Sequence, residues 1–118
     1  MINSSLFLLI FHLGIPDKEI TLVEVEEITR FNQSSSLDIN LGDLRRNVVT
    51  AGVSLNELVG KHFFVGNITL QGIRLCEPCQ HLADLIGDEI FPQLTHRAGI
   101  RAKIISGGTI RLDDIVKA

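Results

Sequence analysis

The chain has 118 residues, the size of a single domain with one modest core. Hydrophobic residues make up 45% of the sequence and charged residues 21%, which predicts a folded globular protein and excludes a disordered one. The net charge of -3 and the absence of Trp and Tyr argue against a general nucleic-acid binder and against a platform on which bases stack.

The first feature along the chain is an apolar run from Ser5 to Ile15. Its 11 residues are too few to span a membrane as a helix. The run has the length of a signal-peptide core, but no Lys or Arg precedes it and no small-x-small cleavage site follows it. We therefore expect a buried strand or a non-native start, and we treat residues 1–17 as an atypical apolar segment ahead of a domain that covers residues 18–118.

From residue 20 onward, short strands alternate with small helices. Alternating or β-branched residues predict strands at 20–25, 47–50, 100–106 and 109–112, and a hairpin within 61–75 that turns at Gly66-Asn67. Helical spacing predicts helices at 24–31, 79–86 and 88–95, and a capping box at Ser54-Leu-Asn-Glu57 predicts a further short helix that ends at Gly60. A polar break at 32–36 and a loop at 37–46 follow the first helix, and Gly107-Gly108 is a second hairpin turn. This pattern predicts a β-rich fold with short α-helices, arranged as a partly closed barrel.

Both cysteines lie in one segment, Arg74-Leu-Cys-Glu-Pro-Cys79-Gln-His-Leu82, between a predicted strand and a predicted helix. A thiol at such a turn can lie near the N-terminal end of the helix, where free N–H groups and the dipole favour a thiolate, and Arg74 could add positive charge there. A thiolate is the form that binds a soft metal or carries sulfur. Two cysteines at this spacing do not suggest a disulfide-rich secreted scaffold, so we expect a reducing compartment, the cytoplasm.

Positive charge is concentrated in the later part of the chain. Of the 11 Lys and Arg, only Lys18 and Arg30 precede Arg45. A local group of arginines in an acidic protein predicts a small anionic ligand, such as a phosphate or a carboxylate, better than a polyanion. The alternative is a set of solvated surface charges. The group consists of Arg45, Arg46, Arg74, Arg97, Arg101, Lys103 and Arg111.

Three segments in this order and spacing resemble one family: Gly42-Asp-Leu-Arg-Arg-Asn-Val-Val-Thr-Ala-Gly52, the cysteine segment 74–82, and His96-Arg-Ala-Gly-Ile-Arg-Ala-Lys103 followed by Gly107-Gly-Thr-Ile-Arg111. They resemble the MOSC domain, the C-terminal module of molybdenum-cofactor sulfurases, which also occurs as small stand-alone bacterial proteins. The resemblance covers about residues 18 to 116. It implies a β-rich, barrel-like fold that handles the molybdenum–pterin cofactor or sulfur destined for a metal centre. Some relatives are molybdoenzymes that reduce N-hydroxylated substrates with a Cys bound to molybdenum.

The resemblance also implies roles for the two thiols. Pro78-Cys79 looks like the cysteine motif of the family, so Cys79 is the predicted catalytic residue and metal ligand, or the carrier of a persulfide. Cys76 is an additional thiol, which could resolve a persulfide on Cys79 as a disulfide or could simply be packed, as free Cys often is. A zinc site of Cys76, Cys79, His81 and His96 is disfavoured, because this spacing matches no usual zinc finger.

The predicted cofactor-binding residues are Arg45, Arg46, Asn47, Arg74, Arg97 and Arg101. Arg45-Arg46-Asn47 resembles the Arg-Asn step at the cofactor pocket of the family, where guanidinium groups can hold a pterin phosphate and an Asn can pair with the edges of the pterin ring. The alternative is a turn whose arginines pair with Asp38 and Asp43. Arg97 and Arg101 flank Ala98-Gly99, where the backbone can approach a ligand closely. Arg97 could instead complement the dipole at the end of a helix.

The sequence departs from the family at its start. MOSC domains usually have several dozen residues before the segment that matches Ile20-Thr-Leu, whereas about 17 residues precede it here. Missing strands would leave barrel edges open. Either another chain covers them, for instance in a homodimer, or Ser5 to Ile15 substitutes in part, or the chain is a fragment. Besides a cofactor-binding or sulfur-carrying module with a sulfur-donor protein as partner, a non-catalytic remnant or small-anion binding module therefore stays open.

Overall fold

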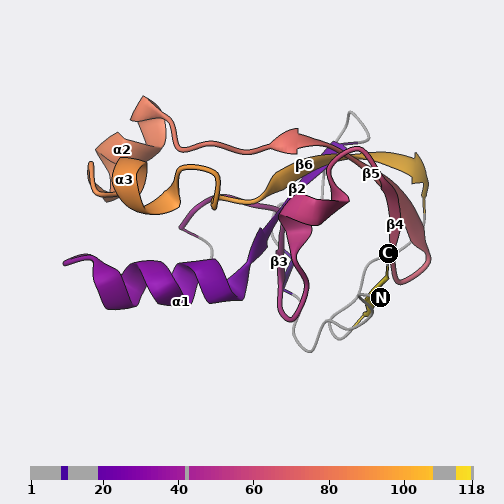
Figure 1. The fold of residues 1–118 in the computed structure, drawn as a ribbon, viewed down its shortest axis with the longest axis horizontal. Helices are drawn as coiled ribbons and strands as arrows, with labels where there is room; N and C mark the ends of the chain where they lie inside the picture. The colour runs from indigo at the N-terminus through magenta and orange to yellow at the C-terminus, as the bar shows by residue number, and fades with distance from the viewer. Residues whose placement is uncertain (1–8, 11–18, 42, 108–113, 118) are drawn as a thin grey trace.

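A computed structural model of the chain describes residues 9–10, 19–41, 43–107 and 114–117. Its strands form one sheet in the order β1-β3-β2-β6-β5-β4-β7, which curls as a half-barrel (Figure 1). This confirms the predicted β-rich, partly closed barrel with short helices. The strands are β1 (Leu9–Ile10), β2 (Glu19–Glu24), β3 (Val48–Thr50), β4 (His62–Val65), β5 (Ile68–Leu75), β6 (Ile100–Ser106) and β7 (Val116–Lys117).

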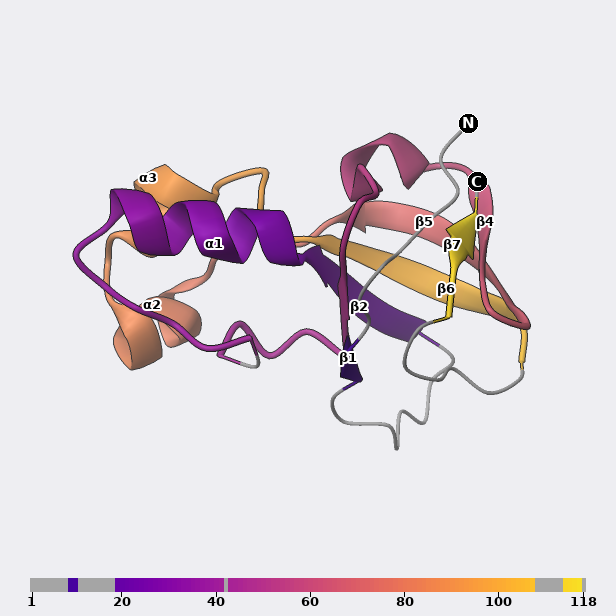
Figure 2. The ribbon, with the colours of Figure 1, turned by 90° about the horizontal axis from the view of Figure 1, so that it is seen from below.

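Three α-helices gather beyond one end of the strands (Figure 2). They are α1 (Val25–Ser34), α2 (Gln80–Ile86) and α3 (Ile90–Leu94), and a short 3-10 helix, η1 (Leu55–Leu58), lies between β3 and β4. No helix in the described part of the chain is long and apolar enough to cross a membrane.

One face of the sheet forms the larger core. In β4 the buried Phe63 and Val65 alternate with the exposed His62 and Phe64, the period-two pattern of a strand with one buried face. Side chains from β2, β3, β5, β6 and β7 complete the same core and pack against η1. The strand residues include Ile20, Leu22, Val48, Leu70, Ile100, Ala102 and Val116, and η1 contributes Leu55 and Leu58.

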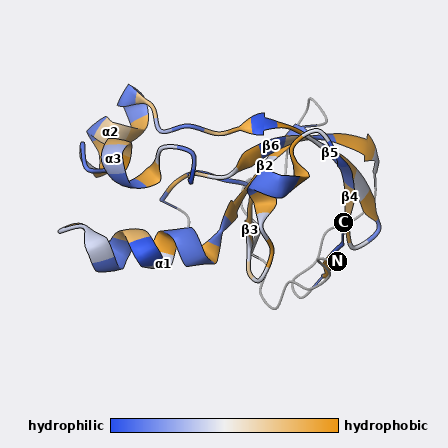
Figure 3. Cartoon of the chain, in the orientation of Figure 1, coloured by the Kyte–Doolittle hydropathy of each residue, from blue (hydrophilic) through white to orange (hydrophobic). Residues whose placement is uncertain are grey.

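The opposite face of β2 and β3 packs against the helices. Val23 and Val49 project into a second core with Ile28 and Phe31, the two buried side chains of α1. Polar and apolar residues alternate along this helix in Figure 3, as expected for a helix with one buried face. Because Thr21 and Arg101 alternate with buried residues of the first core, both lie on this second face.

Most predicted elements are confirmed. The strands at 20–25, 47–50 and 100–106, the hairpin at Gly66-Asn67 and the loop at 37–46 are present, with boundaries shifted by a few residues. The helix after the cysteines ends at Gly87, whose φ of 140 is a backbone conformation that glycine adopts easily and other residues rarely adopt. β7 was not predicted, and the predicted strand 109–112 with its Gly107-Gly108 turn lies outside the described residues.

The predicted capping box is wrong. The side chain of Ser54 makes no capping hydrogen bond, and the Glu57 N–H donates to the backbone carbonyl of Ser54 at 3.2 Å. The tighter 3-10 turn favours this backbone bond. A carboxylate from elsewhere caps the helix instead, because Glu24 Oε2 accepts the Leu55 N–H at 3.0 Å.

Part of the N-terminal run forms a strand, as one of the two expectations had it. Within the described residues, Leu9 and Ile10 pair antiparallel with Val49 and Val48 of β3. β3 pairs in parallel with β2 along one edge, and the crossover that contains α1 connects the two strands. The other edge of β3 is therefore open to β1.

Candidate functional site

The cysteine segment connects β5 to α2. The Cys76 N–H donates to the Gly99 carbonyl at 2.8 Å, which continues the β5–β6 pairing by one bond. The predicted start of the helix is wrong by one residue, because Cys79 is the N-cap of α2 with an extended backbone (φ -127, ψ 169) and makes no side-chain capping bond. Both thiols are free, and they differ in access: Cys76 is 7% exposed, whereas Cys79 is exposed. Cys79 is therefore the thiol that a ligand can reach.

Arg46 provides positive charge next to both thiols. Its Nε donates to the Ala98 carbonyl at 2.8 Å, and one terminal nitrogen donates to the Leu44 carbonyl at 3.1 Å. Burial lowers the pKa of the Arg46 guanidinium, the proximity of Cys76 and Cys79 raises it, and Arg101 lowers it. The hydrogen bonds agree with this proximity, because Arg46 and Cys76 donate to the neighbouring carbonyls of Ala98 and Gly99. Since arginine stays protonated in proteins, it is a fixed cation beside the cysteine segment.

Arg101 and Arg74 bring further positive charge to the sheet. Arg101 of β6 is the register partner of Thr21 in β2 on one side and of Arg74 in β5 on the other. One terminal nitrogen of Arg101 donates to Glu19 Oε1 at 3.1 Å. Its Nε is buried and has no hydrogen-bond partner within the described part of the chain. Like charges directly opposite each other in a sheet are unfavourable, so an anion beside Arg74 and Arg101 would be favourable.

Asn47 lies next to Thr21, the register partner of Arg101, and its amide oxygen accepts hydrogen bonds from Thr21. Asn47 Oδ1 accepts the Thr21 N–H at 2.8 Å and the Thr21 hydroxyl at 3.1 Å, and the Asn47 N–H donates to Thr21 Oγ1 at 3.0 Å. These bonds connect the start of β3 with β2. The predicted pairing of Asn47 with a pterin ring stays a prediction.

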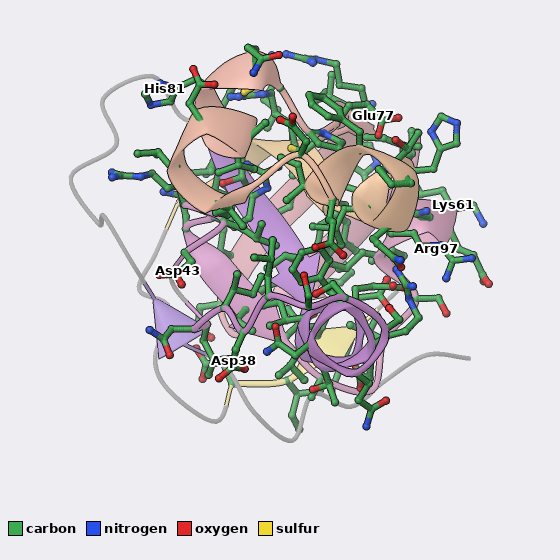
Figure 4. The ribbon with its side chains drawn as sticks, turned by 90° about the vertical axis from the view of Figure 1, so that its left-hand side faces the viewer. Asp38, Asp43, Lys61, Glu77, His81 and Arg97 are labelled. Atoms are coloured by element: carbon green, nitrogen blue, oxygen red, sulfur yellow. The ribbon has the colours of Figure 1, made fainter. Side chains whose placement is uncertain are left out.

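Two of the predicted arginines, Arg45 and Arg97, are exposed, and their side chains make no hydrogen bond to the cysteine segment among the described residues. Arg45 is exposed, has a φ of 61, and lines a pocket with Asp38 and Asp43 without forming an ion pair with a described residue. Arg97 has a 52% exposed side chain, and its terminal nitrogen lies 3.8 Å from Glu27 Oε1 of α1. In Figure 4, Arg97 lies on the opposite side of the view from Asp38 and Asp43.

A pair that the sequence analysis missed, Glu77 and His96, holds the turn behind the cysteines. Glu77 Oε1 accepts the His96 N–H at 2.6 Å, and Oε2 lies 2.5 Å from His96 Nδ1. Asn56 Nδ2 donates to the His96 carbonyl at 2.8 Å, which helps to hold His96 at a φ of 65. The same turn supplies the carbonyls that Arg46 and Cys76 bind. No motif predicts the pair, since its members are 19 residues apart and each is an ordinary surface residue type.

The sequence profile of the MOSC domain matches residues 11–117. The chain belongs to the MOSC domain family. This confirms the resemblance that the three segments indicated. No curated protein matches the sequence significantly.

Solved structures share the fold of this MOSC domain at low sequence identity. YiiM from Geobacillus stearothermophilus has a TM-score of 0.70 and 19% identity, over 89% of this chain and 56% of that protein. YiiM from Escherichia coli has a TM-score of 0.70 and 16% identity, over 97% of this chain and 68% of that protein. The YUAD protein from Bacillus subtilis has a TM-score of 0.74 and 14% identity, over 98% of this chain and 84% of that protein. The chain thus spans little more than half the length of the Geobacillus protein.

The MOSC family is associated with molybdenum-cofactor binding, and the residues around Cys79 fit such a group. Among the described residues, no three His, Cys, Asp or Glu side chains come together to hold a metal ion. A cofactor that brings most of its own metal ligands does not need such a cluster, and one accessible thiol suits a soft metal. The Nε of Arg101, which has no partner among the described residues, and the cation of Arg46 suit the phosphate of a pterin cofactor.

Proposed function

We propose that this MOSC domain binds a molybdenum–pterin cofactor, with Cys79 as its protein ligand or as a carrier of sulfur. The observation that supports this most is the position of Arg46. It donates to the Ala98 carbonyl, next to the Gly99 carbonyl that accepts the Cys76 N–H, and Cys79 of the same cysteine segment is exposed. A partly buried cation next to an accessible thiol favours a bound anion and a soft-ligand bond in the same place.

The arginines and the thiol have separate roles in this proposal. Arg46, Arg74 and Arg101 bind the phosphate of the cofactor, and Arg101 does so through the Nε that has no described partner. Cys79 supplies the thiolate, either to molybdenum or to sulfane sulfur from a donor protein in a reducing compartment, the cytoplasm. When bound, the molybdenum centre supplies oxidation and reduction chemistry, for which the substrates of some relatives suggest an N-hydroxylated compound.

Metal and sulfur analysis of protein from a host that makes the cofactor tests the proposal. Purified chain should contain molybdenum and a pterin detectable by fluorescence after oxidation, or sulfur that cyanide releases. Cys79→Ser should lose the metal or the released sulfur, whereas Cys76→Ser, the matched control, should keep most of it. Wild-type protein that contains neither molybdenum, nor pterin, nor cyanide-labile sulfur would contradict the proposal. Equal losses in both variants would indicate a site shared by the two thiols.

A second candidate function is the binding of a small anion without catalysis. The opposed pair Arg74 and Arg101, with the unpartnered Nε, is what favours it. In that case phosphate or molybdate alone should bind to the cofactor-free chain by calorimetry, Arg101→Gln should weaken this binding, and the protein should never acquire pterin in the host.

A further inference from the structure

A pocket of about 340 Å³ lies between the loop that precedes β3 and the last turn of α2. This volume is at the lower end of the range for small-molecule sites. Four aliphatic side chains form its apolar walls: Leu37 and Ile39 from the loop, and Leu85 and Ile86 from α2. Leu85 is 54% exposed, so a ligand in the pocket would remove apolar surface from water.

Charged side chains of both signs line the same pocket. They are Asp38, Asp43 and Arg45, all exposed. Arg45 forms no ion pair with either carboxylate in the described part of the chain, so none of the three groups is neutralised by another that lines the pocket. The two carboxylates lie on one side of the molecule in Figure 4. The Asn40 N–H donates to Asp43 Oδ2 at 2.8 Å, which fixes the orientation of that carboxylate.

The loop that forms one wall is anchored at several points, although it has no regular secondary structure. Asn32 of α1 accepts the Ile39 N–H at 2.8 Å and donates to the Ile39 carbonyl at 2.9 Å. Leu37 packs so closely on Gly87 that a Cβ there would lie 2.7 Å from Leu37 Cδ1. A wall that is held in place before the ligand arrives lowers the entropic cost of binding.

We propose that this pocket binds a small zwitterion with an aliphatic body, of the class represented by leucine. The ammonium group binds Asp38 and Asp43, the carboxylate binds the Arg45 guanidinium, and the aliphatic part covers Leu85. A simple cation would leave Arg45 without a partner, and a simple anion would meet two carboxylates. Neither cysteine, nor Arg46, Arg74 or Arg101, lines this pocket within the described residues, so the proposal does not depend on cofactor binding.

Calorimetry on the purified full chain tests the proposal with four probes: leucine, glycine, 3-methylbutylamine and 4-methylpentanoate. Leucine should bind, and each probe that lacks the aliphatic body, the carboxylate or the ammonium should bind at least about tenfold more weakly, because each loses one of three contacts. If leucine at about 10 mM gives no heat, the proposal is wrong, because a site with weaker affinity than this would not select one class of ligand. Equal binding of leucine and 3-methylbutylamine would also overturn it, because Arg45 would then contribute nothing.

Variants locate the site. Arg45→Gln should weaken leucine at least about tenfold and leave 3-methylbutylamine unchanged, and Asp43→Asn should weaken both. Asp88→Asn is the charge-matched control, since Asp88 is exposed near the end of α2 and does not line the pocket. Circular dichroism confirms that each variant is folded. If Asp88→Asn lowers leucine affinity as much as Asp43→Asn does, the effect is one of net charge and the proposed site is wrong.

Discussion

Replacing Asn47 with Ala measures how strongly β2 depends on one side chain. The change removes the acceptor of the Thr21 N–H at 2.8 Å and of the Thr21 hydroxyl at 3.1 Å. Thr21 is only 9% exposed, so water does not readily replace that acceptor. A buried donor left without a partner costs about 1–3 kcal/mol, and the second, longer bond contributes about 1 kcal/mol or less. We therefore expect a loss of about 2–3 kcal/mol, or a decrease in Tm of about 8–12 °C at about 4 °C per kcal/mol for a domain of this size.

Urea unfolding followed by circular dichroism gives the loss directly. Thr21→Val keeps the shape of the side chain and removes only the hydroxyl, so the double variant should lose about 1 kcal/mol less than the sum of the single variants. Asn47→Asp keeps an acceptor and should fall between the wild type and Asn47→Ala. If Asn47→Ala unfolds within about 0.5 kcal/mol of the wild type, or if the effects of Asn47 and Thr21 are additive, the reasoning fails.

Three further outcomes are expected. Glu77→Ala should lower stability by about 1–2 kcal/mol and speed the alkylation of Cys76, measured by mass spectrometry, because the carboxylate holds His96; unchanged alkylation would contradict this. Burial raises the pKa of the Glu24 carboxyl above 4.5; nearby acids also raise it, and the Leu55 N–H opposes them. The protonated Glu24 carboxyl therefore contributes fully to stability below pH 4.5, and this contribution is lost as the pH rises through the folded-state pKa. Glu24→Gln should thus be more stable than the wild type at about pH 7, and urea unfolding from about pH 4 to 7 should show a flatter profile; an equally steep profile would argue against it. Deleting residues 1–15 removes β1 and uncovers the edge of β3, so light scattering over a concentration series should show more association than in the full chain, and a monodisperse deletion variant would refute this.

Local patterns predicted the elements of this fold well. The alternation around Phe63 and Val65, the turn at Gly66 and the helix stop at Gly87 depend on neighbours in sequence, so the sequence alone reveals them. The parallel pairing of β2 with β3 joins residues far apart in the sequence, so no local pattern predicts it. The pairing of β1 with the free edge of β3 could not be predicted either, because it depends on that arrangement. The capping box failed because the Glu57 N–H donates to the Ser54 backbone carbonyl of a 3-10 turn, and the Glu24 carboxylate, 31 residues from Leu55, caps the helix instead.

The site was only partly predictable, for the same reason. Arg46 and the two thiols were expected together through the family resemblance, since residues so far apart in sequence have no common pattern. Arg97 was expected with them because it flanks the same backbone turn, but its terminal nitrogen lies 3.8 Å from the Glu27 carboxylate on α1. Charge alone does not say which of several acids an exposed arginine will approach.

The strand order has a consequence for how the cysteine region forms. Arg46 precedes β3, Cys76 follows β5 and Arg101 lies in β6, and the sheet interleaves these strands in the order β3-β2-β6-β5. Chains whose contacts join distant residues fold slowly, because loops must close before those contacts form. The cysteine region cannot assemble before β3, β2, β6 and β5 have paired, so the protection of Cys76 from alkylating reagents during refolding should not precede the pairing of these four strands. The rate at which Cys76 becomes protected from a thiol reagent thus reports when these four strands have paired.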